Sequence, residues 1–408
     1  MSAEAFRLDW IEDGTVTTPR GFRAGSVYAG LKTPGPEKRD VGVLLSDVPA
    51  SVAAVFTANK VAAAPVVVSR ERVKRGTARG ITFNAGNANA ATGDLGLQRA
   101  RQMAEIAAAK FGVAAEELLV ASTGVIGVPL PLEKFQEGIQ RLEIRPDGGH
   151  EAAQCIITTD TRRKETAVRV SVDGRSFSIG AIAKGAGMIH PNMATMLSFI
   201  TTDAAVEPAF LDQALRRAAD ASFNMISIDG DTSTNDTVAL FANGLSGVGP
   251  IKAGSAGAAA FERALAEVCI RMAKAIVADG EGATKLIEVT VEGAETEHDA
   301  RLAARAIASS NLLKAAVYGN DPNWGRIACA AGYSGANLEE SKLDITIAGV
   351  PVLRHGRVLA FDAPAASNAL KRPEVSIAVN LNLGRGRATA WGCDLTEEYV
   401  VVNSKYTT

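Results

Sequence analysis

The chain has 408 residues, with 43 lysines and arginines against 45 aspartates and glutamates, and a formal net charge of −2. Hydrophobic residues make up 47% of it and charged residues 22%, a globular composition that excludes a disordered chain. The balanced charge excludes the basic surface that binds nucleic acid or an anionic membrane, and the length indicates about two folding units.

Targeting and metal-binding patterns are not found in the sequence. The first residues, MSAEAFRLDWIEDG, lack the basic region and apolar core of a secretory signal, and no run of eighteen apolar residues occurs. We therefore expect a cytoplasmic protein. The cysteines and histidines lie far apart without metal-ligand spacing, so we expect no metal site and reduced, buried thiols at Cys155, Cys269, Cys329 and Cys393.

Strand and helix patterns alternate along the first two thirds of the chain. Strand-like runs occupy residues 42–48, 64–73, 80–86, 117–127 and 166–172, and another apolar run covers 196–200. Helical patterns occupy residues 95–111, 208–223 and 257–278. In the last of these, apolar residues at 261, 265, 268, 272 and 276 line one helix face, and Asp279-Gly280 gives a stop signal.

From about residue 284 the pattern changes mostly to short strands. These are TKLIEVTVEGA, KLDITIAGVPV, GRVLAFD, VSIAVNLNLG, RATAWGCDL and EEYVVVN, interrupted by a helix near 299–316. We therefore predict an α/β fold with layered α+β character. It has a large α/β body over residues 1–283 and a smaller β-rich domain over residues 284–408.

Several short motifs favour a plain structural interpretation. KGAGM (184–188) lacks the residue order of a phosphate loop, and GRGR (384–387) is typical of a basic turn. DGDTSTND (229–236) lacks the register of a calcium loop, so turn chemistry explains it better. GNDPNWGR (319–326) is also typical of a turn, although its tryptophan would suit a ligand pocket. STGVIG (122–127) ends a strand at a glycine that would let a backbone N–H approach a ligand.

The stretch MIHPNMATMLSFITTD (188–203) places Thr195 between a glycine-rich turn and an apolar run. A loop that enters a buried strand is the plain interpretation, and the residues alone favour it. The alternative is self-cleavage after Ala194. A threonine hydroxyl is a weak nucleophile without a neighbouring base, and cleavage would free an α-amine on the same residue. The pKa of such an amine, about 7.7–8.0, suits a general base.

A resemblance favours the cleavage hypothesis. KGAGMIHPNMATMLSFITTDA is similar to the signature of the ornithine acetyltransferase family, the self-cleaving enzymes of the cyclic arginine pathway. The resemblance covers nearly the whole chain, in family order, through FNAGNANAATG, ASTGVIG, TTDT, SFNMISIDGDTSTNDT, VADGEGATK, YGNDPNWGRI and NSKYTT. It implies N-terminal-nucleophile-type chemistry, with cleavage between Ala194 and Thr195 into an α chain (1–194) and a β chain (195–408).

The resemblance also implies roles for individual residues. Thr195 is the nucleophile, and Thr123 and Gly124 form the oxyanion hole. Six residues bind the substrate: Thr158, Lys184, Thr195, Glu281, Asn403 and Thr408. Within the TTDT run, Thr161 stays open as an alternative to Thr158.

The implied reaction is ping-pong transfer of an acetyl group from N2-acetylornithine to glutamate through an acetyl-threonine ester. The products are ornithine and N-acetylglutamate, and the resemblance implies no metal or organic cofactor and an α2β2 heterotetramer. Lys184 is the natural partner of the α-carboxylate that both substrates share. Glu281 suits the ornithine ammonium but repels the glutamate side chain, and the sequence leaves open how one pocket accepts both.

Other functions stay open. An N-terminal-threonine amidohydrolase or aminopeptidase would use the same nucleophile but let water attack the acyl-enzyme. An uncleaved amino-acid-binding protein would bind its ligand without turnover. Some members of the family also acetylate glutamate from acetyl-CoA, and no residue of this sequence decides whether this chain does so.

Overall fold

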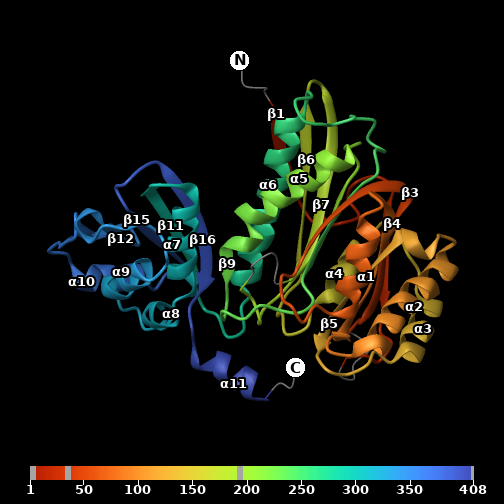
Figure 1. Cartoon of the computed structure of the whole chain (residues 1–408), viewed down its shortest axis with the longest axis horizontal. Coiled ribbons are helices and arrows are strands. Elements are labelled where there is room, and N and C mark those ends of the chain that lie inside the picture. The colour runs from red at the N-terminus through yellow and green to blue at the C-terminus, as the bar shows by residue number, and fades with distance from the viewer. Residues whose placement is uncertain (1–5, 33–37, 191–195, 406–408) are drawn as a thin grey trace.

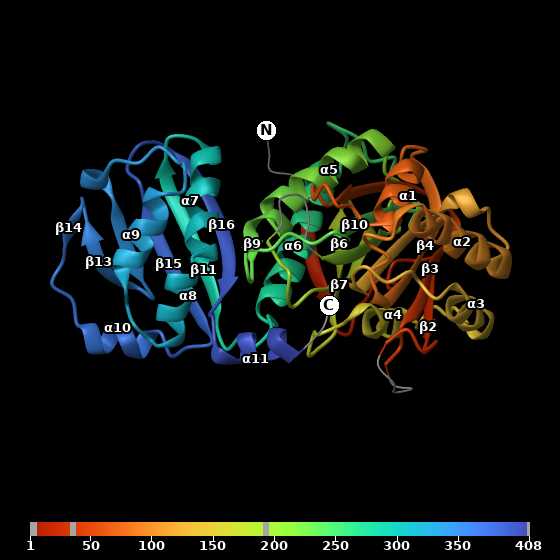
Figure 2. The ribbon, with the colours of Figure 1, turned by 60° about the horizontal axis from the view of Figure 1, so that its bottom comes forward.

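The computed structural model describes residues 6–32, 38–190 and 196–405, which form two bodies side by side (Figure 1; Figure 2). In the described ranges, the larger body is built on a nine-stranded mixed sheet in which β8–β10 and β4–β5 pair in parallel. In spatial order its strands are β1 (Phe6–Ile11), β6 (Lys164–Val172), β7 (Arg175–Lys184), β8 (Leu197–Thr202), β10 (Thr237–Ala242), β3 (Val41–Phe56), β4 (Thr77–Asn87) and β5 (Leu118–Val125), with β2 (Phe22–Val27) paired to β3.

Helices cover this sheet in layers. α5 (Pro208–Ala221) and α6 (Ala258–Val277) pack against each other and against β3, β6 and β7 (Figure 1). α1 (Ala64–Val73), α2 (Gly93–Phe111) and α3 (Leu132–Arg141) form a second group near β3–β5, and α4 (Gly149–Ile156) packs against β2, β3 and β7. Alternation along β7 explains the layering, because Ile179 and Ala181 face the α5–α6 side while Ile182 belongs to the opposite core.

The smaller body is a seven-stranded sheet with helices beside it. Its strands, in spatial order, are β14 (Arg357–Val358), β13 (Val350–Arg354), β12 (Asp344–Ile347), β15 (Glu374–Asn380), β11 (Leu286–Ala294), β16 (Gly386–Cys393) and β9 (Ile226–Ser227). Its helices are α7 (Glu297–Ser309), α8 (Asn311–Tyr318), α9 (Trp324–Gly332) and α10 (Ala363–Ala369). The last described helix, α11 (Glu397–Lys405), leads back toward the larger body (Figure 2).

One continuous hydrophobic core joins the two bodies. It runs from β6–β8 through α5 and α6 to α7, β11 and β15. The apolar face predicted for residues 257–278 is the centre of this core, and its five apolar side chains are at most 2% exposed. Short 3₁₀ turns complete the described elements: Ala115–Glu117, Phe223–Met225 and Glu340–Lys342.

Two predicted strands are helices. The run 64–73 forms α1, because Pro65 fits the first helical turn and the buried side chains do not alternate along it. The hydroxyl of Ser69 on this helix donates to the carbonyl of Val120 on β5 at 2.7 Å and accepts the N–H of the same residue at 2.8 Å. The EEYVVVN segment forms α11. Glu397 lies in its first turn and Lys405 in its last turn, where each charge interacts favourably with the helix dipole.

Smaller differences concern the C-terminal region and the thiols. The helix predicted near 299–316 is two helices, because Ser310 caps the second by accepting the N–H of Leu313.

Three cysteines are buried and free, and burial raises the pKa of each: to about 12 for Cys155 and Cys269 and to about 11 for Cys393. Cys329 is exposed, so the prediction of burial is wrong there.

In the described ranges, no helix combines the length and the hydropathy needed to cross a membrane.

Candidate active site

Six of the residues singled out from the sequence line one cavity of about 140 Å³. They come from separate parts of the chain: Thr123, Gly124, Thr158, Lys184, Glu281 and Asn403. Ala194, Thr195 and Thr408 lie outside the described residues. The described chain resumes at Met196, which lines a smaller, adjacent cavity.

Strand ends supply one wall of the cavity. Thr123 and Gly124 lie near the end of β5, where the backbone of Gly124 has a φ of +131°. A Cβ on Gly124 would lie 2.3 Å from the carbonyl carbon of Gly86 on β4, so only glycine fits this approach. Asn235 supports the same strand end, since its Nδ2 donates to the carbonyl of Ser122 at 2.8 Å.

Lys184 ends β7 and reaches the β5 wall. Its side chain is buried, and Nζ donates to the hydroxyl of Thr123 at 3.2 Å. Burial lowers the pKa of Lys184, while the carboxylate of Asp160 acts in the opposite direction. The cavity therefore presents a cation that is held beside a threonine hydroxyl.

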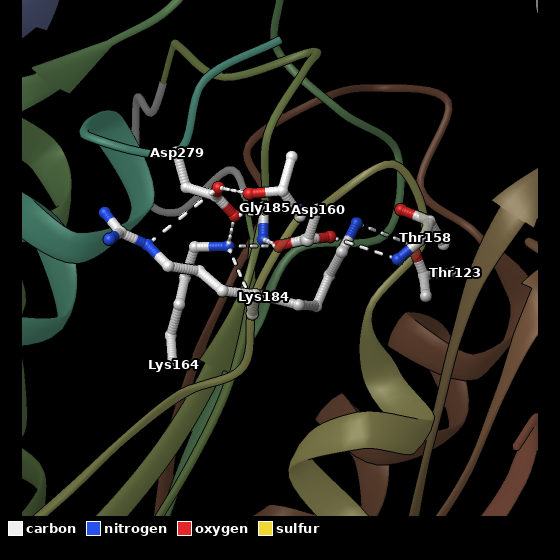
Figure 3. A network of polar contacts seen from close by, with 9 residues as sticks. Thr123, Thr158, Asp160, Lys164, Lys184, Gly185 and Asp279 are labelled. Atoms are coloured by element: carbon white, nitrogen blue, oxygen red, sulfur yellow. Dashed lines mark hydrogen bonds and ion pairs between the residues drawn. The ribbon is translucent and has the colours of Figure 1, made fainter. Parts of the chain in front are cut away.

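A buried polar network lies behind Lys184 (Figure 3). Nζ of Lys164 lies 2.6 Å from one carboxylate oxygen of Asp160 and 2.6 Å from one of Asp279. Asp160 also accepts the N–H of Gly185 at 2.7 Å and that of Thr158 at 3.0 Å. The network thus fixes three loops that reach the cavity: the one after α4, the one after β7 and the one after α6.

The network separates the two threonines that the sequence left open. Thr161 donates its hydroxyl to Asp279, and its N–H binds the other oxygen of that carboxylate at 3.1 Å. Thr158 lines the cavity. Of these two, Thr158 is therefore the residue placed to meet a ligand.

Glu281 and Asn403 form another wall. Nδ2 of Asn403, on α11, donates to Oε2 of Glu281 at 2.7 Å. The N–H of Glu281 donates to the carbonyl of Ala186 at 2.8 Å, and a Cβ on Gly187 would lie 2.5 Å from Oε2 of Glu281. The glycines of KGAGM therefore let the turn pack closely on the Glu281 carboxylate.

The sequence did not assign the 229–236 loop to the site. Asp229, Asp231, Ser233, Thr234 and Asn235 all line the cavity. Asp229 shows the expected turn chemistry, since it accepts the N–H groups of Met188 and Ile189 at 2.6 and 2.9 Å. The density of side-chain oxygens was the available signal, and it was interpreted as a turn alone. In the described part of the chain, no group of three or more His, Cys, Asp or Glu side chains could hold a metal ion.

Tyr399 also lines the cavity and was missed, because the EEYVVVN segment was expected to be a strand. Burial raises the pKa of its hydroxyl, and the nearby carboxylates of Asp229 and Glu281 raise it further. Acidic side chains outnumber the single lysine among the described lining residues. The cavity therefore suits a small ligand that carries both an anionic and a cationic group.

His190 does not line either cavity. Its Nδ1 lies 3.0 Å from the hydroxyl of Ser227, and its Nε2 lies 3.3 Å from Nη2 of Arg305. Burial lowers the pKa of His190, and the guanidinium of Arg305 lowers it further. His190 therefore serves as a neutral link between the two bodies.

The whole chain is similar to one family of proteins. The model of the ArgJ family matches residues 23–408. The arginine biosynthesis bifunctional protein ArgJ of Symbiobacterium thermophilum is 51% identical over 403 residues, covering 98% of this chain and 100% of that protein. The protein of that name from Dehalococcoides mccartyi is 48% identical, covering 98% and 99%. The solved argJ structure from Bacillus halodurans has 45% identity and a TM-score of 0.51, covering 52% of this chain and 100% of that chain.

Proposed function

Because the chain belongs to the ArgJ family, we propose that it is an acyltransferase of arginine biosynthesis that moves an acetyl group from N2-acetylornithine to glutamate. One observation carries the proposal: a single cavity gathers a lysine, two threonines, a carboxylate and an amide from distant segments of the chain. Such a cavity offers both charges that an N-acetylated diamino acid requires.

The nucleophile of this proposal is Thr195, freed by cleavage after Ala194. Two observations support it. Met196, which follows Thr195 in the sequence, lines the smaller cavity together with Thr123 and Lys184. The solved argJ chain from Bacillus halodurans is matched completely by 52% of this chain, so it is about half as long, as a product of mid-chain cleavage would be.

The reaction then has two halves. In the first, Oγ of Thr195 attacks the acetyl carbonyl while the α-amine of Thr195 takes the hydroxyl proton. Thr123 and Gly124 stabilise the oxyanion, at about 3 kcal/mol per donor. Ornithine leaves with the proton, and an acetyl-threonine ester remains. In the second half, the α-amine of glutamate attacks this ester, and Oγ of Thr195 recovers its proton.

Binding roles follow from the charges. Lys184 pairs with the α-carboxylate common to both substrates. Glu281, held by Asn403, pairs with the δ-ammonium of ornithine, and Thr158, which lines the cavity, adds a polar contact. The family resemblance assigns Thr408 to the same role.

Mass spectrometry of the purified protein tests the proposal. We expect two chains, 1–194 and 195–408, and one added acetyl group on the second chain after mixing with N2-acetylornithine alone. Addition of glutamate should remove that acetyl group and yield N-acetylglutamate. An intact chain that only binds ligand would support an amino-acid-binding protein, and release of ornithine and acetate without N-acetylglutamate would support a hydrolase.

A second activity follows from the name of the relatives, which are called bifunctional. We propose that the same threonine also accepts an acetyl group from acetyl-CoA and passes it to glutamate. Incubation with acetyl-CoA and glutamate in the absence of acetylornithine tests this proposal. If no N-acetylglutamate forms, the chain only recycles the acetyl group.

Three further features belong to the proposal. The α and β chains assemble as an α2β2 heterotetramer, which native mass spectrometry would detect. Residues 1–283 and 284–408 form the larger and the smaller domain, which is supported by the strands β11 to β16 in one sheet; the seventh strand of that sheet, β9 (Ile226–Ser227), comes from the larger part of the chain. The enzyme works in the cytoplasm, and its free thiols suit that reducing compartment.

A further inference from the structure

Asn235 lies where the two cavities meet. It lines both of them, as Thr123 does, and it is 6% exposed. It comes just before β10, and its own N–H donates to the hydroxyl of Ser233 at 3.1 Å, so its backbone is held in place. The reaction proposed above gives its side chain no role.

The amide of Asn235 joins the ends of two parallel strands. Its Nδ2 donates to the carbonyl of Ala88, just after β4, at 2.6 Å and to the carbonyl of Ser122 on β5 at 2.8 Å. Its Oδ1 accepts the hydroxyl of Thr234 at 2.6 Å. An amide nitrogen has two N–H donors, and here both are given to protein carbonyls. Asn235 therefore has no donor left for a ligand, although it lines the cavity.

The pairing of β4 with β5 is irregular close to this amide. The register shifts just after the pair Gly86 and Gly124, whose φ angles of +94° and +131° lie outside regular strand geometry. Beyond this point, the N–H of Ala88 donates to the carbonyl of Val125 at 2.9 Å. The Asn235 amide is the second link between the two strand ends. Side-chain bonds thus hold the end of β5 where the regular ladder stops.

The carbonyl that Asn235 holds belongs to the oxyanion-hole segment. The carbonyl of Ser122 and the N–H of Thr123 are parts of one planar peptide unit, so a bond that fixes the carbonyl also fixes the direction of the N–H. The next peptide unit carries the N–H of Gly124. Donors stabilise an oxyanion only when they are aimed at its position before the reaction, and small displacements weaken this effect strongly.

We propose that Asn235 is a positioning residue that aligns the oxyanion-hole donors at Thr123 and Gly124. This inference rests on the proposed function, in which these donors stabilise the oxyanion of both half-reactions. Asn235 itself neither moves a proton nor binds the substrate. Its loss should therefore slow the chemical step and leave substrate binding almost unchanged.

The test is Asn235→Ala, which removes the amide without adding a charge. Quenched-flow mass spectrometry measures how fast the enzyme becomes acetylated by N2-acetylornithine alone. We expect the rate constant at saturation to fall about 100-fold, while the substrate concentration that gives half of this rate changes less than about twofold. This split distinguishes misaligned donors from a general loss of the shape of the site.

Asn243→Ala is the matched control. Asn243 follows β10 directly at its other end, and its Nδ2 donates to the carbonyl of Arg20 at 2.9 Å. Asn243 lines neither of the two cavities. The control therefore loses the same kind of bond beside the same strand, and its acetylation rate should equal that of the wild type. An equal fall in both variants would trace the effect to β10 and overturn the proposal.

The remaining outcomes also decide the question. An unchanged rate constant in Asn235→Ala refutes the role, and so does a rate constant that falls together with the affinity for substrate. A folded but uncleaved variant assigns Asn235 to the cleavage step and overturns the proposal as well. If Asn235→Ala does not fold, Asn235→Asp decides, since it keeps the shape but replaces the donor group by oxygen. A normal rate constant there refutes the role. If the wild type takes up no acetyl group, the proposed function itself fails.

Discussion

Lys164 and Asp279, 115 residues apart in the chain, form a buried ion pair in which Nζ lies 2.6 Å from Oδ2. Asp160 is a second carboxylate at the same distance from this ammonium. The triad connects β6 to the loop that carries Glu281. It therefore contributes both to the stability of the fold and to the position of a residue that lines the cavity.

Replacement of Lys164 by methionine should therefore be strongly destabilising. Two buried carboxylates would lose their cation, a loss of about 3–5 kcal/mol in the free energy of unfolding. Urea denaturation measures it. Lys342→Met is the control, because its pair with Glu339 is about half exposed and should contribute at most about 1 kcal/mol. Equal losses in the two variants would contradict the importance of the buried triad.

Asp160 should make stability depend on pH in the acid range. Burial raises its pKa, but Lys184, Lys164 and the hydrogen bonds lower it from 3.8 to about 2. Because the folded-state pKa is the lower one, the stabilisation is complete above about pH 4 and is lost as the pH falls toward 2. The loss should be about 2 kcal/mol. Asp160→Asn should remove this part of the pH dependence of the free energy of unfolding. Asp147→Asn, at a carboxylate that is 81% exposed, should leave the pH dependence unchanged. If Asp160→Asn does not change the pH dependence of the free energy of unfolding, Asp160 is not its source.

Gly187→Ala should weaken substrate binding. The new methyl would lie 2.5 Å from Oε2 of Glu281, and the carboxylate would have to move. We expect the KM for acetylornithine to rise about tenfold, equivalent to about 1.4 kcal/mol, with a smaller change in stability. Gly332→Ala is the matched control, because a methyl there meets nothing within 4 Å. An unchanged KM in Gly187→Ala would argue against Glu281 as a substrate contact.

The proposed nucleophile can be tested directly. Thr195→Ala should yield a folded, intact and inactive chain, because both cleavage and acetyl transfer need the hydroxyl. Thr195→Ser keeps a hydroxyl and should retain partial cleavage. A denaturing gel and an acetyl-transfer assay distinguish these outcomes. Normal transfer by Thr195→Ala would require a different nucleophile.

The pH dependence of catalysis should report the α-amine. Lys184 should lower the pKa of that amine below its reference value of roughly 7.7–8.0. Lys184→Met should therefore move the rising limb of the kcat/KM profile to higher pH and also weaken substrate binding. His190→Ala should leave the limb in place, because His190 is engaged by Ser227 and Arg305 outside the cavity. If His190→Ala abolishes the limb, the amine is not the base.

The sequence predicted the elements whose pattern is periodic. The helix over 257–278 and the strand over 80–86 are confirmed, because apolar residues that recur on one helix face or at alternate positions of a strand can be seen directly in the sequence. The run of three consecutive valines in α1, residues 66–68, was misleading, because a proline at the helix start and contacts with β5 outweigh the strand preference of valine. Tyr399 could not be found from the sequence, because its place in the cavity depends on α11, a segment whose residues predicted a strand.

The order of strands in the larger sheet has a consequence for the cleaved protein. β8 and β10 follow the proposed cut, yet they lie between β7 and β3, which precede it. The two products are thus joined by strand pairing on both sides of β8–β10, and neither fragment contains the complete nine-stranded sheet. Cleavage would leave the assembly intact but turn an intramolecular fold into the association of two polypeptides. After full denaturation, recovery should therefore follow second-order kinetics and depend on protein concentration, whereas the uncut Thr195→Ala chain should refold at a rate independent of it.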